Sequence, residues 1–395
     1  MSTDSRPVES TTATPGLESA AFVRLVTRAD GDALAASGIV ARALAERGTP
    51  FQVSVGRTVA ERTDRVQAPG DEGDLTLVVG AVDADVARLD AGDRPATLAA
   101  VDRVRELGVT PDPVLSLAGL VAAGVEPGAG ESEWVLETAT DRDLVDRRPG
   151  VAVPTADPVD GITHSTRLCG PWSGDLDAAR EALTSSVDLE SDDFGEADYR
   201  AIASAVALDV VGAEEATETA ANAIRHGLKP YVTPDAPFAT VGGYADVLEA
   251  TARTEPGTGV ALAMGHDARE PALSAWREYG RCAHETLESA STGRYDGLFV
   301  VGIDDGPVEA IARLAVAYRS PEPVVLAVAA DGGEVAIATR DDDPLGATVE
   351  RIARELESEI EIGGVAYDVG RRRGYLRYDP AVDRSTVVTT AREVL

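Results

Sequence analysis

The chain has 395 residues, a hydrophobic content of 44% and a formal net charge of −32, and this length suits two or three domains rather than one compact core. Its two cysteines provide neither a disulfide framework nor the spacing of a zinc site. Because the longest apolar runs are far too short to span a bilayer and residues 1–5 lack the basic start and apolar core of a signal peptide, we expect a cytoplasmic protein without membrane contact.

The net charge is interpreted as an adaptation to the habitat of the protein and not as a sign of what it binds. Lys229 is the only lysine, and 68 acidic residues outnumber 36 basic ones, which is typical of a protein kept soluble in a very salty cytoplasm. The absence of a basic face does not exclude a nucleic-acid ligand, because the release of counterions contributes little to binding at high salt.

Strands and helices alternate in the first part of the chain. Residues 1–17 are rich in Ser, Thr, Pro and Glu, which predicts a disordered tail. Strands are predicted at 22–27, 51–55 and 75–79, and helices at 33–47 and 95–107. This alternation predicts an α/β lobe over residues 18–150, with a parallel sheet covered by helices on both faces.

The remainder divides into a helical part and a second α/β domain. Residues 151–288 form the helical remainder of the first lobe, with helical spacing at 178–185, 196–211 and 214–225. The polar residues 289–293 are predicted to be a linker. The pattern then restarts with strands at 298–302, 323–328 and 334–338 and helices at 308–319 and 345–359, which predicts a small domain over residues 294–395.

The segment Arg28-Ala29-Asp30-Gly31-Asp32-Ala33 lies between the first strand and an alanine-rich helix, where an α/β sheet places ligands. It resembles the opening of the DHH phosphoesterase superfamily, and of its RecJ-like branch in particular, which reads His-x-Asp-x-Asp-Gly before a helix of small residues. Aligning that helix puts Asp30 and Asp32 on the two family aspartates and Arg28 on the histidine. A competing register pairs Asp30-Gly31 with the Asp-Gly of the family, but it shifts the helix by two residues.

Three later segments extend the resemblance over nearly the whole chain. Residues 164–175 and 242–247 are similar to stretches of archaeal RecJ-like proteins. The C-terminal part resembles the DHHA1 module, whose Gly-Gly-His-x-x-Ala-Ala-Gly loop corresponds to residues 363–370, with Val365 in place of the histidine. The resemblance implies a DHH-type parallel-sheet lobe with a helical extension, followed by a smaller DHHA1-like α/β lobe.

The departures from the family concern its metal ligands. Gly80 stands where the second-motif aspartate would end a strand, the Asp-His-His signature is missing, and none of the four histidines lies in the first 163 residues. Two-metal catalysis needs several carboxylates and imidazoles around both ions. Asp30 and Asp32 are therefore interpreted as vestigial catalytic residues and weak metal ligands. The alternative interpretation is a βα turn that caps a helix N-terminus.

The strongest candidate for binding is the loop that contains Gly363, Gly364 and residues 370–373 (Gly370, Arg371, Arg372 and Arg373). Glycines let backbone amides approach a phosphate, and arginine binds phosphate through two parallel hydrogen bonds. Arg340 is a candidate for the same groove, and tyrosines at 367, 375 and 378 are candidates for stacking on a base. The alternatives are a solvated hairpin tip whose arginines pair with acidic residues, and a surface position for Arg340.

The resemblance implies two hypotheses for function. Active RecJ relatives degrade single-stranded DNA from the 5′ end with Mn²⁺ or Mg²⁺, whereas the archaeal RecJ-like branch includes partners of the GINS complex and the MCM helicase, and a eukaryotic relative has lost nuclease activity. The first hypothesis is a nuclease-deficient replisome protein that binds single-stranded DNA without a metal cofactor. The second is an active 5′-3′ single-strand exonuclease, in which Asp83, Asp85 or Asp209 completes a Mn²⁺ or Mg²⁺ site.

Overall fold

A parallel sheet organises the first part of the chain in this computed structural model, which describes residues 16–69, 71, 73–89, 94–191, 194–329, 331–341, 344–359 and 364–395. Its strand order is β2-β1-β3-β4 and every pair is parallel, as predicted. The strands are β1 (Phe22–Arg28), β2 (Phe51–Gly56), β3 (Asp74–Val79) and β4 (Ala87–Arg88). The register pairs Arg28 with Gly56 and Thr27 with Val79, so three strands end at one edge.

Helices follow these strands and extend the lobe. Helix α1 packs against β1, β2 and β3 and also against α3 and α4. Of the predicted tail, residues 1–15 lie outside the described residues, and the side chain of Leu17 is buried in the core. The helices of this part are α1 (Gly31–Arg47), α2 (Val59–Gln67), α3 (Ala96–Glu106), α4 (Pro113–Ala122), η1 (Gly130–Ser132) and α5 (Glu133–Asp141).

The middle of the chain is mainly helical, as predicted. It contains α6 (Pro158–His164), α7 (Leu176–Thr184), α8 (Glu196–Gly212), α9 (Ala220–Arg225), α10 (Val241–Thr254), α11 (Pro256–Ala263) and α12 (Arg269–Ser289), with the short strands β5 (Asp146–Arg147) and β6 (Tyr231–Val232). The helix predicted at 214–225 is wrong in its first half. Thr217 N donates to the carbonyl of Tyr318 and Thr219 Oγ1 to that of Ala317, which holds the segment before α9 in a turn.

The second lobe contains a six-stranded sheet with the order β11-β12-β10-β9-β8-β7, in which only β8 and β9 pair in parallel among the described strands. Its strands are β7 (Ser291–Tyr295), β8 (Leu298–Ile303), β9 (Val324–Ala329), β10 (Glu334–Thr339), β11 (Ala366–Val369) and β12 (Arg373–Arg377). Its helices are α13 (Val308–Leu314), continued by the π-helical turn η2 (Ala315–Arg319), α14 (Gly346–Glu359) and α15 (Arg384–Val394). The linker predicted at 289–293 is wrong, because Ser289 ends α12 and residues 291–293 pair with β8.

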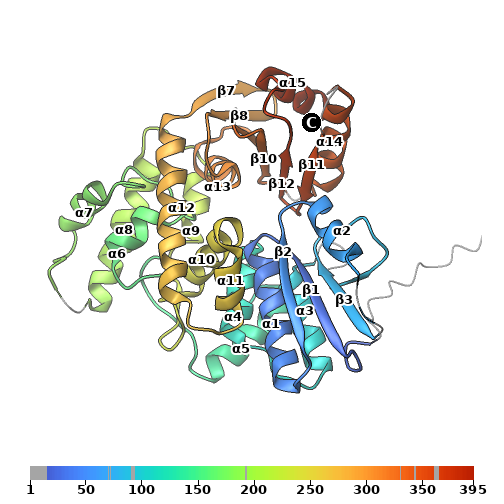
Figure 1. Ribbon diagram of the computed structural model, residues 1–395. Coiled ribbons are helices and arrows are strands. Elements are labelled where there is room, and N and C mark those ends of the chain that lie inside the picture. The colour runs from blue at the N-terminus through green and yellow to red at the C-terminus, as the bar shows by residue number, and fades with distance from the viewer. Residues whose placement is uncertain are drawn as a thin grey trace, which may run out of the picture.

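The two lobes share one hydrophobic core. Val301, Ile303 and Val325 on one face of the second sheet belong to the same buried cluster as Leu25 of β1 and Trp276 of α12. The other face of that sheet packs on α14 and α15 through a separate cluster. In Figure 1 the second lobe, in orange and red, lies over the sheet and helices of the first, and α12 runs beside α10 and ends next to β7. Among the described residues, none of the helices is long and apolar enough to cross a membrane.

Candidate functional site between the lobes

Asp30 follows β1 and caps the N-terminus of α1. Its Oδ1 accepts a hydrogen bond of 2.8 Å from the backbone N of Ala33, and its Oδ2 forms an ion pair with Nε of Arg28. Burial raises the pKa of the Asp30 carboxyl, but the positive charges of Arg28 and Arg253 outweigh it and hold this pKa below its usual value. The carboxylate is therefore ionised, and both of its oxygens are bonded to protein donors.

Asp32 lies in the first turn of α1 but caps a different helix, α3. Its Oδ2 accepts from the backbone N of Ala96 at 2.9 Å, and its Oδ1 accepts from N and Oγ1 of Thr97 at 2.9 and 2.6 Å. Burial and the neighbouring charge of Asp30 raise the pKa of Asp32 to about 6, against the opposing effect of these hydrogen bonds. Both carboxylates thus cap helix N-termini, as in the alternative interpretation of this segment.

Arginines fill the space beside these carboxylates. Gly80 has a positive φ of 110°, and a Cβ added there would lie 3.0 Å from Cβ of Arg28 and 3.4 Å from Nε of Arg62. Arg62 is fully buried, and its guanidinium donates to the carbonyl of Gly56 at 2.9 Å and to that of Ala81 at 2.8 Å. An aspartate in place of Gly80 would collide with this packing and adopt a strained backbone.

The carboxylates proposed to complete a metal site lie elsewhere. Asp83 and Asp85 are exposed and do not line the cleft around Asp30, and Asp209 is on α8 in the helical part of the lobe. Within the part of the chain that the structure describes, no three His, Cys, Asp or Glu side chains are placed to hold a metal ion. Because all four oxygens of Asp30 and Asp32 already accept hydrogen bonds or ion pairs, these residues do not fit a pair of divalent ions.

The loop predicted to bind phosphate is the tip of the β11–β12 hairpin, and the hairpin contacts Arg28 next to this tip. Nη1 of Arg28 donates to the carbonyl of Val369 at 3.1 Å. Gly370, Arg371 and Arg372 form the tip, and the backbone N of Leu345 donates to the carbonyl of Arg371 at 3.0 Å. Gly364 is exposed before β11, and Gly363 lies outside the described residues.

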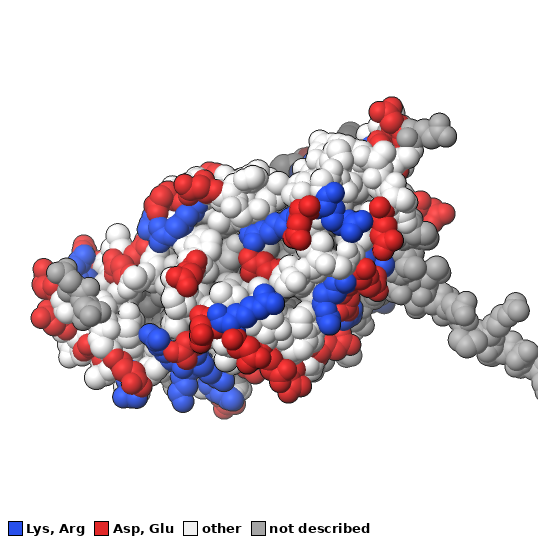
Figure 2. Space-filling model, turned by 90° about the horizontal axis from the view of Figure 1, so that it is seen from below, with Lys and Arg blue, Asp and Glu red and all other residues white. Residues whose placement is uncertain are grey.

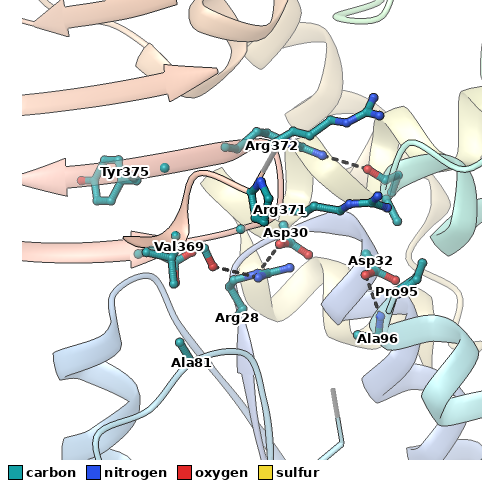
Figure 3. Close-up of a pocket in the computed structure, with 18 of the residues that line it drawn as sticks. Arg28, Asp30, Asp32, Ala81, Pro95, Ala96, Val369, Arg371, Arg372 and Tyr375 are labelled. Carbon is teal, nitrogen blue, oxygen red and sulfur yellow. Dashed lines mark hydrogen bonds and ion pairs between the residues drawn. The ribbon is translucent and has the colours of Figure 1, made fainter. Parts of the chain in front are cut away.

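A cleft of about 250 Å³ separates this tip from the carboxyl edge of the first sheet. Figure 3 shows Arg371 and Arg372 on one side of it and Arg28, Asp30 and Asp32 on the other. We call it the interlobe cleft; its charged lining residues are Arg28, Asp30, Asp32, Arg88, Arg94, Arg253, Glu309, Asp368, Arg371, Arg372 and Arg373. Of these described residues, seven are arginines and four are carboxylates, so the lining is positive in a chain whose net charge is −32.

The cleft arginines differ in what they contact. Nη1 of Arg373 donates to Glu249 at 2.7 Å, and its Nη2 donates to the carbonyl of Ala122 at 2.8 Å, so Arg373 holds the hairpin to the first lobe. Arg371, in contrast, is exposed and its guanidinium bonds to none of the described side chains or carbonyls. Arg371 is therefore the cleft arginine most available to an anion.

Other predicted binding residues lie away from this position or are covered. Arg340 does not line the cleft, because its guanidinium donates to the carbonyls of Ser320 and Pro321, each at 3.2 Å, within its own lobe. Tyr375 is 1% exposed, its hydroxyl donates to Glu334 at 2.6 Å, and the guanidinium of Arg57 lies 4.1 Å from its ring centroid. Its ring is not available for stacking on a base.

Glu249 is a central residue of the site that the sequence analysis did not identify. Its Oε2 accepts from the backbone N of Gly31 at 2.8 Å, and its Oε1 pairs with Arg373 and, at 3.2 Å, with Arg253. Burial raises the pKa of Glu249, but the charges of Arg373, Arg253 and Arg313 hold it well below its usual range. The only signal in the sequence was a glutamate among the mostly small and apolar residues of α10, 218 positions after Gly31.

The comparisons with known proteins identify both a family and a fold. The chain is 45% identical to "Uncharacterized protein rrnAC1427" of Haloarcula marismortui over 361 residues. The match covers 90% of this chain and 89% of that relative. The family model "Uncharacterized protein rrnAC1427, C-terminal domain" matches residues 290–393.

Solved structures extend this comparison to more distant proteins. CDC45 from Entamoeba histolytica superposes with a TM-score of 0.58 at 7% identity, over 94% of this chain and 95% of that one. RecJ in complex with Mn²⁺ from Thermus thermophilus gives a TM-score of 0.44 at 15% identity, over 96% of this chain and 53% of that one. The chain thus belongs to the family of the Haloarcula marismortui protein rrnAC1427, and it shares its two-lobed α/β fold with CDC45.

Proposed function

We propose that this protein is a nuclease-deficient member of the RecJ-like group that binds single-stranded DNA in the interlobe cleft and needs no divalent metal. The proposal rests on one observation, which is that the carboxylates of Asp30 and Asp32 are already bonded to protein groups. Their carboxylates cap α1 and α3 and pair with Arg28, while the opposite wall of the cleft presents arginines. A site of this kind can hold a phosphate, and among the residues that the structure describes no set of carboxylates and imidazoles is placed to hold the metal ions that would activate water.

The distribution of charge supports a polyanionic ligand. Of the four described carboxylates that line the cleft, three are neutralised by arginine: Asp30 by Arg28, Asp368 by Arg62, and Glu309 by Arg253. Arg371 stays unpaired within the described residues. On the face of the molecule drawn in Figure 2, basic and acidic side chains are interspersed. The binding site proposed for DNA is thus the local positive lining of the cleft, centred on Arg371 and Arg372 beside Gly370.

The resemblance to the archaeal RecJ-like branch extends the proposal to partners. A role in the replisome, with the GINS complex and the MCM helicase as partners, rests on that resemblance alone. We propose further that the protein works in the cytoplasm at high salt, which agrees with its net charge of −32.

Single-strand binding and degradation with purified protein test the proposal. We expect a 5′-labelled single-stranded DNA to bind in potassium chloride of about 0.5 to 2 M and to stay intact with Mn²⁺ present. Arg371→Ala/Arg372→Ala should weaken binding by about tenfold or more, because each arginine contributes charge-assisted hydrogen bonds to phosphate. Arg281→Ala/Arg354→Ala removes the same charge from exposed helix positions and should change affinity less than about twofold.

Two outcomes would overturn the proposal. If the control pair weakens binding as much as the cleft pair, or if no DNA binds at any of these salt concentrations, the cleft is not a DNA site. If Mn²⁺ supports degradation of the DNA from its 5′ end and Asp30→Ala abolishes it, the protein is the exonuclease of the second hypothesis.

A further inference from the structure

Arg28 connects three parts of the molecule that meet at the cleft. It ends β1, it forms an ion pair with Asp30 at the start of α1, and its Nη1 donates to the carbonyl of Val369 in the second lobe at 3.1 Å. The side chains of Arg28 and Asp30 are 14% and 12% exposed, so water screens this pair only partly. Figure 3 shows both interactions converging on the one guanidinium.

Two glycines lie close to Arg28. A Cβ added at Gly80 would lie 3.0 Å from Cβ of Arg28, and one added at Gly370 would lie 3.8 Å from its Nη1. Glycines thus approach Arg28 from the end of β3 and from the hairpin tip. Arg28 is packed as an integral part of both lobes, and the position of Gly80 has no room for a carboxylate ligand.

Two more arginines repeat this arrangement on the same hairpin. Arg62 bonds to the carbonyls of Gly56 and Ala81 in the first lobe and to the carboxylate of Asp368 in the second. Arg373 reaches in the opposite direction, from β12 to Glu249 and Ala122 of the first lobe. The hairpin is thus tied to the first lobe at residues 368, 369 and 373, and also by an exposed contact of Arg377 with Glu61 at 3.3 Å. Every tie uses a planar guanidinium with several N–H groups in fixed directions.

We infer that Arg28 is a built-in cation beside Asp30 that serves as a metal-independent joint between the lobes, so that the β11–β12 hairpin stays docked on β1 whether or not a divalent ion or a ligand is present. The inference goes beyond the proposed function, because it concerns the free protein and holds with or without DNA binding. It assigns Arg28 a positioning role: it fixes where the hairpin tip, with Arg371, stands relative to Asp30.

Hydrogen exchange of the full-length protein without DNA tests the joint. In Arg28→Ala, we expect amide exchange in residues 366–377 to accelerate by about tenfold, since one of the buried ties is lost and local opening becomes easier. Arg281→Ala, which removes an arginine from exposed pairs on α12, should leave this hairpin unchanged. If Arg28→Ala does not fold because Asp30 is left buried and unpaired, Arg28→Ala/Asp30→Asn removes that charge, and the same acceleration is expected.

A second hydrogen-exchange experiment compares the protein with and without Mn²⁺. In the wild type, exchange of residues 366–377 should be the same with Mn²⁺ and with a chelator. The inference is overturned if Mn²⁺ slows exchange of the hairpin in the wild type but not in Asp30→Ala, because a metal would then be part of the joint. It is also overturned if the hairpin of the folded Arg28→Ala variant exchanges at the wild-type rate. Neither result depends on whether the protein binds DNA.

Discussion

His284 on α12 shows how a single buried side chain makes stability depend on pH. The residue is 4% exposed, and its Nε2 lies 2.9 Å from the carbonyl oxygen of Ser165, to which a neutral imidazole can donate. Burial is the main cause that lowers the pKa of His284 to about 4, although the bond to Ser165 and the charge of Asp246 act in the other direction. The folded protein therefore keeps this ring neutral at pH values where the unfolded chain takes up a proton.

We predict that His284 makes the protein less stable as the pH falls from about 6.5 to about 4. Its pKa is lower in the folded than in the unfolded state, so its contribution is complete above pH 6.5 and decreases by about 3 kcal/mol towards pH 4. Denaturant unfolding of wild type and His284→Gln across this range measures the effect. The difference in unfolding free energy between the two proteins should shrink as the pH falls, and a constant difference would contradict the prediction.

The roles of Asp30 and Asp32 were only partly accessible from the sequence. An aspartate before an alanine-rich run is a helix-capping signal, and Asp30 does cap α1. That Asp32 caps α3 instead could not be predicted, because its donors at Ala96 and Thr97 come from a helix 64 positions later. The same applies to Arg373, which was a candidate phosphate ligand and is bonded to Glu249, 124 positions earlier. Local patterns identify caps, but partners across the fold depend on packing.

At the scale of elements, α1 is fixed by close contacts rather than by strong amphipathicity. Thirteen of its 17 residues are buried, and it packs against α3, α4, α10 and α11. A Cβ at Gly38 would lie 2.6 Å from both Cβ and the carbonyl oxygen of Ala263 on α11. The helix therefore needs a residue without a side chain there, although glycine is a poor helix former.

We predict opposite effects for two Gly→Ala substitutions in this helix pair. Gly38→Ala should destabilise the protein by about 1 to 3 kcal/mol, because backbone atoms of Ala263 cannot move aside as a flexible side chain would. Gly257→Ala on α11, where a Cβ would meet nothing within 4 Å, should raise stability by about 0.5 to 1 kcal/mol. Denaturant unfolding at neutral pH measures both, and a stabilising Gly38→Ala would refute the packing argument.

Helices and strands were predicted correctly where the local periodicity reflects burial. The prediction failed where a segment forms hydrogen bonds with the other lobe. The strands at 75–79 and 334–338 and the helix at 345–359 are found within one residue of their predicted limits, because apolar runs and helical spacing reflect burial directly. The half-helix lost at 214–219 contains three glutamates, which favour a helix, and two threonines. Carbonyls of Ala317 and Tyr318, 98 and 101 positions away, capture its threonines instead.

At the scale of the whole molecule, the lobes behave as one body because they share a core and several arginine ties. Arg57 adds another tie: it pairs with Glu309 and Glu334 of the second lobe, each at 3.0 Å. Arg313 of α13 is bonded to Thr166 of the first lobe. The predicted two-lobed α/β architecture is confirmed, but the predicted linker suggested more independence between the lobes than the structure allows.

We predict a single unfolding transition for the full-length protein. Because the largest buried cluster includes residues of both lobes, neither lobe can unfold without exposing the apolar surface of the other. Calorimetry at high salt should give one peak whose van't Hoff enthalpy equals the calorimetric enthalpy. Two resolved peaks would show that the lobes unfold separately. Arg62→Ala, which leaves Asp368 buried without its partner, should lower the midpoint of this single peak rather than split it.

The shared core also determines how this molecule can be cut for study. The family model begins at residue 290, immediately after α12, and suggests a natural point of division. A fragment beginning there would carry Val301, Ile303, Val325 and Ala327 on a sheet face whose covering helices include residues left behind, such as those of α12. An uncovered apolar face of this kind favours self-association in water, all the more at the high salt that such an acidic chain calls for. The segment that the family model matches is thus shorter than the part of the chain that shares one buried core.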